Sequence, residues 1–368
     1  MKIGIDASRI ALEQRTGTEN YTYKLIEALK KVDQTNKYIL YFNKIPNYFE
    51  ISQQNVSTRV IPMTRLWTQF RLAVECLVRM PDILFVPAHT IPFIRWPKLK
   101  TIVTVHDLGA EFLAAYHRFP QKLYLNWSTK YVASNANHII AVSESTKKDL
   151  VKTFKVDPQR ISVVPEAVDT NNFYCRGVRE VAQVKKELGI TKPYLLFVGT
   201  IQPRKNLEKL IEAFSQLQDK NLELILAGRP GWLYEDIYAA PKKFNVAGRV
   251  KFLGYVNEDQ LPALYSGAEA FVFPSLYEGF GLPLLEAMAT GTPVITSKTS
   301  CMPETTGGNA ILVNPNKTRE ITQAMAKVLT DKLLRAELTA AGLRWAKQFT
   351  WEETAKKTIA GFEKVYKE

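Results

Sequence analysis

Short, uninterrupted apolar runs recur along this chain, and segments of helix length separate them. Continuous runs of Val, Ile, Leu and Phe suit parallel strands that are covered on both faces. Alternation of such strands with helices predicts a doubly wound α/β architecture. The predicted strands are residues 3–6, 38–42, 83–86, 101–105, 138–142, 161–164, 194–198, 222–227, 250–253, 270–273 and 293–295. The main predicted helices are residues 21–31, 124–136, 144–154, 181–188, 206–218, 283–289 and 320–329.

The series of strands is interrupted by a polar, irregular segment at 169–179, and a second series starts near residue 194. A length of 368 residues also favours two domains over one. We therefore predict two Rossmann-like domains, residues 1–172 and 173–349, with a final capped helix at 350–368. Ligands of such sheets bind beyond the carboxyl ends of the strands, so two facing sheets would share one central cleft.

The net charge of +13 implies an acidic partner such as a phosphorylated ligand, an anionic membrane surface or a nucleic acid. Zinc-ligand spacings, RNA-recognition signatures and Lys/Arg tracts are absent from the sequence, so no nucleic-acid partner is expected. Generic solubilising lysines explain part of the charge. Phosphorylated ligands and peripheral contact with an anionic membrane are the partners that we expect.

The sequence also favours a cytoplasmic location, with possible peripheral contact at the inner face of the cell membrane. No run of about 18 uncharged apolar residues is present, so we expect no transmembrane helix. The first six residues read directly as a strand rather than as a signal peptide. The cysteines Cys76, Cys175 and Cys301 are odd in number and lack metal-ligand spacing, which fits a reducing compartment.

A glycine loop joins the apolar strand at 270–273 to an apolar helix, and seven residues, Gly279 and Gly281 among them, separate Glu278 from Glu286. Loop amides and the positive end of a helix can hold an anion. Two carboxylates on either side of that anion can accept hydrogen bonds from hydroxyls. A nucleotide sugar has this shape, with ribose, diphosphate and sugar in sequence. An ordinary strand–turn–helix unit with incidental acids is the alternative.

The whole phrase from Pro274 to Glu286, continued by Gly291-Thr292-Pro293-Val294-Ile295, closely resembles the glutamate-x7-glutamate signature of retaining glycosyltransferases of family 4. Five further segments resemble the same family, and together they span nearly the whole chain. The resemblance implies the GT-B fold, with a C-terminal helix that crosses back to the first domain. The alternative for that helix is one that simply completes the second domain. The chain looks most like mannosyltransferase-type members.

Two adjacent cations, Arg204 and Lys205, stand between a strand end and a helix start, where positive charge is unfavourable without an anion. We expect them to hold the diphosphate. Arg204 would donate two hydrogen bonds to a phosphate, and Lys205 would supply a point charge. Many relatives carry an arginine directly after Gly199, where this chain has Thr200. Arg204 would only partly replace that missing arginine.

The resemblance implies that His106, at the end of a buried strand, contacts the donor sugar, although a satisfied core pair with Asp107 is the alternative. It gives catalytic roles to His106, Glu278, Lys205 and Arg204. Glu278 would bind sugar hydroxyls and Glu286 the ribose. The full set of implied donor-binding residues is Gly17, Gly199, Thr200, Arg204, Lys205, Gly228, Arg229, Tyr255, Val256, Glu278, Gly279, Phe280, Gly281, Leu282 and Glu286. The family's asparagine and glycine are replaced by Glu166 and Ala167 in this chain, next to the interdomain region.

Two basic, aromatic segments are candidates for acceptor or lipid contact, namely residues 65–79 and 112–130. A helix with one core face and solvated arginines is the alternative for the first segment. The acceptor residues proposed in the second are Asp107, Tyr116, His117 and Arg118, with a glycan or lipid-linked glycan as acceptor. Ser143 reads as a helix cap, with ligand contact as a secondary possibility.

The expected reaction is retaining transfer of a hexose in cell-surface polysaccharide synthesis, with mannose from GDP-mannose as the leading donor and a UDP-sugar as the alternative. No aspartate-x-aspartate motif occurs, so we expect fixed cations and amides to replace a divalent metal, and we expect no cofactor. A non-catalytic nucleotide-sugar-binding protein is a further alternative. Phosphorylases and epimerases share the fold, and a nucleic-acid binder fits only the charge.

Overall fold

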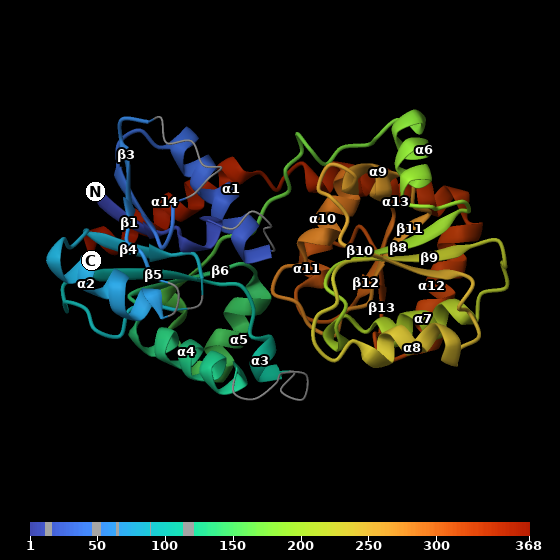
Figure 1. Cartoon of the computed structure of the whole chain (residues 1–368), viewed down its shortest axis with the longest axis horizontal. Helices are drawn as coiled ribbons and strands as arrows, with labels where there is room; N and C mark the ends of the chain where they lie inside the picture. Colours follow the sequence, from blue (N-terminus) through green and yellow to red (C-terminus); the bar gives the residue numbers. More distant parts are fainter. Residues whose placement is uncertain (12–16, 46–52, 64–65, 89, 113–120) are drawn as a thin grey trace. The chain divides into compact units, whose positions relative to one another are not determined.

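The computed structural model describes residues 1–11, 17–45, 53–63, 66–88, 90–112 and 121–368. The chain divides into two compact units, each shown in Figure 1. Unit 1 comprises Met1–Leu108, Phe119–Glu166 and Trp351–Glu368, and unit 2 comprises Gly109–Arg118 and Ala167–Thr350. The cleft that the sequence suggests between two domains stays a prediction.

The described part of unit 1 is built on a parallel sheet in the order β3-β2-β1-β4-β5-β6-β7. Its strands are β1 (Lys2–Asp6), β2 (Lys37–Phe42), β3 (Val56–Val60), β4 (Ile83–Val86), β5 (Lys100–Val105), β6 (His138–Ala141) and β7 (Ile161–Val163). The strand β3 was not predicted. It is a partly exposed edge strand, and its polar residues Ser57, Thr58 and Arg59 break the apolar pattern. Strand order reverses between β1 and β4, and such switch points are where parallel sheets bind ligands.

Helices of unit 1 cover the sheet on both sides (Figure 1). They are η1 (Ser8–Ala11), α1 (Gly17–Val32), η2 (Thr68–Leu72), α2 (Ala73–Val78), α4 (Gln121–Asn135), α5 (Glu144–Phe154), η4 (Pro158–Arg160) and α14 (Trp351–Lys367), while α3 (Gly109–Phe112) groups with unit 2. The last helix confirms the predicted return to the first domain. Its Phe362 and Val365 are buried in the same core as Ile3 and Leu25, and the Phe362 ring lies 5.2 Å from that of Phe85.

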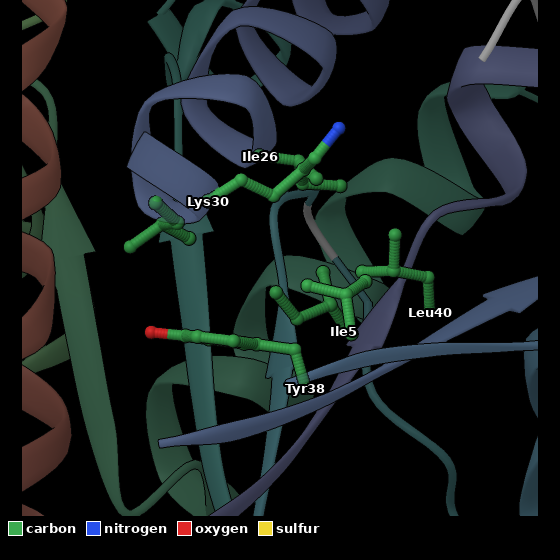
Figure 2. A pocket seen from close by; sticks show the side chains of 7 residues that line it. Ile5, Ile26, Lys30, Tyr38 and Leu40 are labelled. Atoms are coloured by element: carbon green, nitrogen blue, oxygen red, sulfur yellow. The ribbon is translucent and has the colours of Figure 1, made fainter. Parts of the chain in front are cut away.

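The space between α1 and the sheet is closed by apolar side chains rather than left as a binding pocket. Figure 2 shows this hollow, with Ile26 and Lys30 of α1 above Ile5, Tyr38 and Leu40 of the sheet. No water molecule fits inside it. The hollow therefore belongs to the apolar core of unit 1.

The described part of unit 2 holds a second parallel sheet in the order β10-β9-β8-β11-β12-β13. Its strands are β8 (Tyr194–Val198), β9 (Glu223–Ala227), β10 (Val250–Gly254), β11 (Ala270–Phe273), β12 (Val294–Ser297) and β13 (Ile311–Val313). Strand order reverses between β8 and β11, which pair directly through Leu195 and Leu196. The short edge strand β13 was missed, because three residues give too little pattern to recognise.

Two groups of helices flank this second sheet (Figure 1). They are α6 (Val178–Glu187), α9 (Leu261–Ser266), α10 (Leu282–Ala289), α11 (Met302–Thr306) and α13 (Lys332–Ala346), with η5 (Pro203–Lys205), α7 (Leu207–Ser215), α8 (Glu235–Lys243) and α12 (Thr318–Thr330). Central strands such as β11, with Phe271, Val272 and Phe273 fully buried, are apolar throughout because helices cover both faces. No helix in the described part of the chain combines the length and apolarity needed to cross a membrane.

Candidate active site

The switch point of unit 2 brings Arg204 and Lys205, which follow β8, against Glu278, which follows β11. Lys205 Nζ donates to Glu278 Oε1 at 2.7 Å, and Arg204 Nη1 donates to Oε2 at 2.9 Å. Lys205 and Glu278 are each only 7% exposed. The sequence predicted all three residues separately, but it gave no sign that they form one buried ionic cluster.

The ionised form of Glu278 is favoured in this cluster. Burial by itself would raise the pKa of Glu278, but the charges of Arg204 and Lys205 outweigh it, so the pKa lies below its ordinary value. Two cations against one carboxylate leave the cluster with one positive charge in excess. Desolvated cations attract an incoming phosphate far more strongly than exposed ones do.

The surrounding backbone fixes this cluster in place. Arg204 Nη1 also donates to the carbonyl of Tyr277 at 3.0 Å, and the carbonyl of Arg204 accepts from Leu276 N at 2.9 Å. Ser300 Oγ donates to the carbonyl of Glu278 at 2.5 Å. The two strand ends are therefore joined by backbone as well as by side chains, and the cations are pre-oriented before any ligand arrives.

Glycines bring the ends of neighbouring strands into close backbone contact. Gly228, after β9, has φ +150°, and a Cβ there would lie 1.9 Å from the carbonyl oxygen of Gly199, after β8. Gly199 N donates to the carbonyl of Ala227 at 2.9 Å, and Gly228 N donates to that of Gly254 at 2.7 Å. The predicted glycines at 199 and 228 are thus required by the fold of this edge. The neighbouring Thr200 is exposed.

The glycine loop after β11 ends at Gly281, the N-cap of α10, whose φ of +85° is a left-handed conformation that favours glycine. Leu282 is the first residue of that helix, Phe280 is buried beside Phe349, and Gly279 lies in the loop. The predicted strand, loop and helix are therefore observed in the predicted order. The first turn of α10 follows the same loop after β11 that carries Glu278.

Glu286 lies one turn into α10, and its Oε2 accepts from the Tyr265 hydroxyl at 2.9 Å. Burial, followed by the charge of Glu286, raises the pKa of Tyr265 well above its usual range, so the tyrosine is a permanent donor at neutral pH. This tyrosine was missed in the sequence, because a lone Tyr in an apolar helix reads as core. It orients one carboxylate oxygen of Glu286.

Arg229 and Tyr255 come from two adjacent strand ends and meet at the surface. The guanidinium of Arg229 lies 4.5 Å from the centre of the Tyr255 ring, and Tyr255 is 46% exposed. Val256 beside it is buried. An exposed aromatic ring with a cation on its face is a surface on which a nucleotide base can stack.

In unit 1, His106 follows β5 and lies between two oxygen atoms. Its Nδ1 is 2.9 Å from Glu166 Oε1, and its Nε2 is 3.0 Å from the carbonyl oxygen of Pro87, after β4. The Tyr21 ring packs edge-on at 4.6 Å. From the sequence, Asp107 was the alternative partner of His106 in a buried pair. In the structure His106 instead pairs with Glu166, which is 60 residues away in the sequence.

Other predicted residues of unit 1 have mixed outcomes. Gly17 is the first residue of α1, where a Cβ would meet no protein atom within 4 Å, and its implied contact with the donor stays a prediction. Ser143 caps α5 by accepting from Thr146 N at 3.0 Å, which confirms capping. Tyr116, His117 and Arg118 lie outside the described residues.

No three His, Cys, Asp or Glu side chains converge as a metal site within the part of the chain that the structure describes. The described site offers two adjacent cations, carboxylates and backbone amides. Such a set can bind a diphosphate, hydrogen-bond sugar hydroxyls and stabilise a departing anion.

Family models divide the chain in the same way as the two sheets. Residues 15–172 match the model described as Glycosyltransferase Family 4, and residues 178–345 match the model described as Glycosyl transferases group 1. O-antigen chain mannosyltransferase B of Escherichia coli is 32% identical over 267 residues, which cover 72% of this chain and 70% of that protein.

A second relative extends the similarity over almost the full length. O-antigen chain mannosyltransferase RfbU of Salmonella typhimurium is 28% identical, with 90% of this chain and 92% of that protein covered. Among solved structures, Anabaena HepE in complex with UDP and glucose superposes with a TM-score of 0.76 at 16% identity, covering 99% of both chains. That superposition supports the fold. With its two matched models and its mannosyltransferase relatives, the chain belongs to the group 1 glycosyltransferases of GT-B fold, and it is a hexosyltransferase of polysaccharide biosynthesis.

Proposed function

We propose that this chain is a retaining mannosyltransferase that uses GDP-mannose without a metal ion and extends a glycan or lipid-linked glycan. The observation that carries the proposal is the buried cluster of Arg204, Lys205 and Glu278 at the β8/β11 switch point. The choice of sugar is supported by the two relatives described above, which are named O-antigen chain mannosyltransferases.

In this proposal Arg204 and Lys205 bind the diphosphate and stabilise it as it leaves, and Glu278 binds the sugar. Oxygens of the diphosphate replace part of the Glu278 carboxylate as partners of Arg204 and Lys205, in charge-assisted hydrogen bonds. Glu278 then accepts from hydroxyls of the sugar. As the sugar leaves, negative charge grows on the diphosphate, and the fixed cations stabilise it without reorganisation.

Retention arises either from a covalent double displacement or from attack by the acceptor on the side from which the diphosphate leaves. The described site offers no convincing carboxylate pair for a covalent double displacement, since Glu278 is already held by two cations. We therefore propose a front-face route in which the leaving phosphate takes the proton of the acceptor hydroxyl. Fixed cations supply the charge stabilisation that a metal ion would otherwise give.

We also propose that unit 1 contacts an anionic membrane through the helix at residues 67–78. Positions that normally carry polar residues on a solvated helix hold Phe70, Val74 and Val78, which are 56%, 52% and 71% exposed. Trp96, 53% exposed, lies beside them, because its Nε1 donates to the carbonyl of Leu77. Arg71 and Arg79, adjacent in sequence to Phe70 and Val78, are exposed, as is Lys98, two residues after Trp96. An apolar strip with a basic rim fits a headgroup layer.

A flotation assay with vesicles of phosphatidylglycerol and phosphatidylethanolamine tests the membrane proposal. The Val74→Ser, Val78→Ser double variant should lose most of its vesicle binding, because two apolar anchors are removed. Val178→Ser with Leu333→Ser is the matched control, since these residues of unit 2 are 86% and 79% exposed. Equal binding by all three proteins would rule out this face as the anchor.

A thermal-shift panel in EDTA with GDP, UDP, GDP-mannose, UDP-glucose and UDP-N-acetylglucosamine tests the donor. A ligand that binds only the folded state raises the Tm, by an amount that grows with its concentration over its Kd. We expect GDP and GDP-mannose to raise the Tm and the uridine ligands to leave it unchanged. A shift that appeared only after Mg²⁺ was added would contradict metal independence.

A UDP-sugar is the second candidate donor. It is favoured by the superposition on HepE, whose solved structure contains UDP and glucose. A base can be read largely by backbone groups at the ends of β9 and β10, which leave no trace in the sequence. A selective shift with UDP and one UDP-sugar would decide for this alternative and keep the transferase mechanism intact.

A further inference from the structure

The environment of His106 fixes where its protons are. The carbonyl oxygen of Pro87 can only accept a hydrogen bond, so the Nε2 atom 3.0 Å away must carry a hydrogen. On the other side, Nδ1 lies 2.9 Å from an oxygen of Glu166. If Glu166 is ionised it also can only accept, and Nδ1 must then carry a hydrogen too. Both conditions together describe an imidazolium.

The alternative is a neutral imidazole whose Nδ1 accepts a hydrogen bond from a protonated Glu166. It would place two neutral groups in the hydrogen bond and leave the carboxylic acid 12% exposed. A charge-assisted bond between imidazolium and carboxylate is roughly twice as strong as a neutral one. The side chain of His106 is 11% exposed, so the pair is shielded from water on both sides.

We propose that Glu166 is a positioning residue that keeps His106 doubly protonated at neutral pH, which makes the histidine a fixed cation rather than a proton acceptor. Both ring nitrogens already have protein partners, so His106 contributes charge and shape at this strand end. Its part in sugar transfer rests on the proposed function, whereas its protonation state does not.

The other groups around the ring act in the same direction. Burial lowers the pKa of His106, but the hydrogen bond and charge of Glu166 outweigh it, and the Pro87 carbonyl and Asp107 add to them, so the pKa is raised. Tyr21 of α1 stays neutral, because burial raises the pKa of its hydroxyl far above neutral pH.

Nitrogen-15 NMR of the histidine side chains in the full chain measures this protonation state. The sequence has four histidines, and the His106 signals are assigned by their loss in His106→Gln. We expect both His106 nitrogens to show protonated shifts at pH 7. His138 is an internal reference, because burial followed by nearby Lys364, Arg160 and Lys147 lowers its pKa to about 4. A His106 spectrum of the neutral type at pH 7 would overturn the proposal.

A variant separates the charge of Glu166 from its shape. Glu166→Gln keeps the size of the side chain but removes the anion, so the titration midpoint of His106 should fall by about 1 to 3 pH units. Glu166→Asp restores the charge and should recover part of that shift. Glu337→Gln, an exposed change of the same charge on α13, should leave His106 unaffected. An unchanged midpoint in Glu166→Gln would refute the role of Glu166.

The two proposals can fail separately. If Glu166→Gln does not fold, the wild-type spectrum alone still decides whether His106 is doubly protonated. If no nucleotide shifts the Tm but His106 is an imidazolium, the donor assignment fails and the assignment of charge stands. If GDP-mannose binds and His106 is neutral, the donor assignment stands and the assignment of charge to His106 fails.

Discussion

Each of the two sheets places a charged cluster beyond the ends of its parallel strands, but the clusters differ in kind. Unit 2 sets two permanent cations, Arg204 and Lys205, against one carboxylate. Unit 1 sets one titratable cation, His106, against one carboxylate. The first cluster has a surplus of positive charge that neutral pH cannot change. The second is balanced, and its charge depends on pH.

This difference assigns separate tasks to the two units. A permanent positive surplus suits a ligand of permanent negative charge, such as the diphosphate of a nucleotide sugar. A balanced pair attracts no strong anion but holds a side chain in one orientation. We therefore expect changes in unit 2 to abolish donor binding, and changes in unit 1 to alter pH dependence.

Lys205→Met should have the largest effect on activity. The lysine is a desolvated cation beside the leaving group, and removal of one such group typically costs 10²- to 10³-fold in kcat, or about 3 to 4 kcal/mol. Turnover of GDP-mannose at saturating donor measures the loss. Lys220→Met, an exposed change of the same charge, is the control. Turnover within about two-fold of wild type in Lys205→Met would remove this residue from the mechanism.

Gly228→Ala should have the largest effect on stability. The new methyl group would lie 1.9 Å from the Gly199 carbonyl oxygen, at a backbone φ of +150°. The free energy of unfolding should fall by about 3 kcal/mol or more, because backbone has to move. Urea unfolding measures it. Gly248→Ala, where a Cβ meets nothing within 4 Å, should change it by less than about 1 kcal/mol. If Gly228→Ala lowered the free energy of unfolding as little as Gly248→Ala, the close backbone contact between Gly228 and Gly199 would not be needed for stability.

The pH dependence of stability should distinguish the two clusters. The raised pKa of His106 contributes stability that is complete below the unfolded value of about 6.5 and is lost as pH rises through the folded value. The lowered pKa of Glu278 contributes stability that is present above about 4.3 and is lost as pH falls through the folded value.

Urea unfolding of wild type, Glu166→Gln and Glu278→Gln across pH measures these contributions. The advantage of wild type over Glu166→Gln should shrink on the alkaline side, and its advantage over Glu278→Gln should shrink on the acid side. Each pKa unit corresponds to about 1.4 kcal/mol. Parallel pH curves for all three proteins would show that neither cluster is coupled to folding as described.

Arg229→Ala should have the smallest effect. Its guanidinium stacks on the exposed Tyr255 ring, and exposed cation–π contacts contribute about 0.5 to 1 kcal/mol. GDP affinity should fall by about two- to five-fold, and the Lys205 cluster should retain its role. Titration calorimetry with GDP measures the change. A loss as large as that of Lys205→Met would move the centre of nucleotide binding to β9 and β10.

Much of the fold follows from the sequence, because parallel strands covered on both faces leave continuous apolar runs such as residues 194–198 and 270–273. The polar edge strand β3 and the three-residue edge strand β13 leave no such run and were missed, although the edge strands β7 and β10 were predicted. The position of Glu278 was predicted from its local phrase. Its ion pairs with residues more than 70 positions earlier were not, since pairing over that distance depends on strand order.

The pair in unit 1 shows the same limit. His106 was predicted as a site residue and Glu166 was noted as unusual, but nothing in the sequence joined them. Their contact exists because β5, β6 and β7 are neighbours in the sheet, which brings the ends of β5 and β7 to one edge. The Pro87 carbonyl leaves no sequence signal, because every residue has one.

The most direct test of the account is calorimetric titration of GDP and GDP-mannose into wild type, Lys205→Met and Glu278→Gln in EDTA. Lys205 is assigned to the diphosphate and Glu278 to the sugar, so Lys205→Met should weaken both ligands. Glu278→Gln should still bind GDP but lose the additional affinity that mannose gives in wild type. If both variants bound both ligands as wild type does, the cluster at the β8/β11 switch point would not be the donor site.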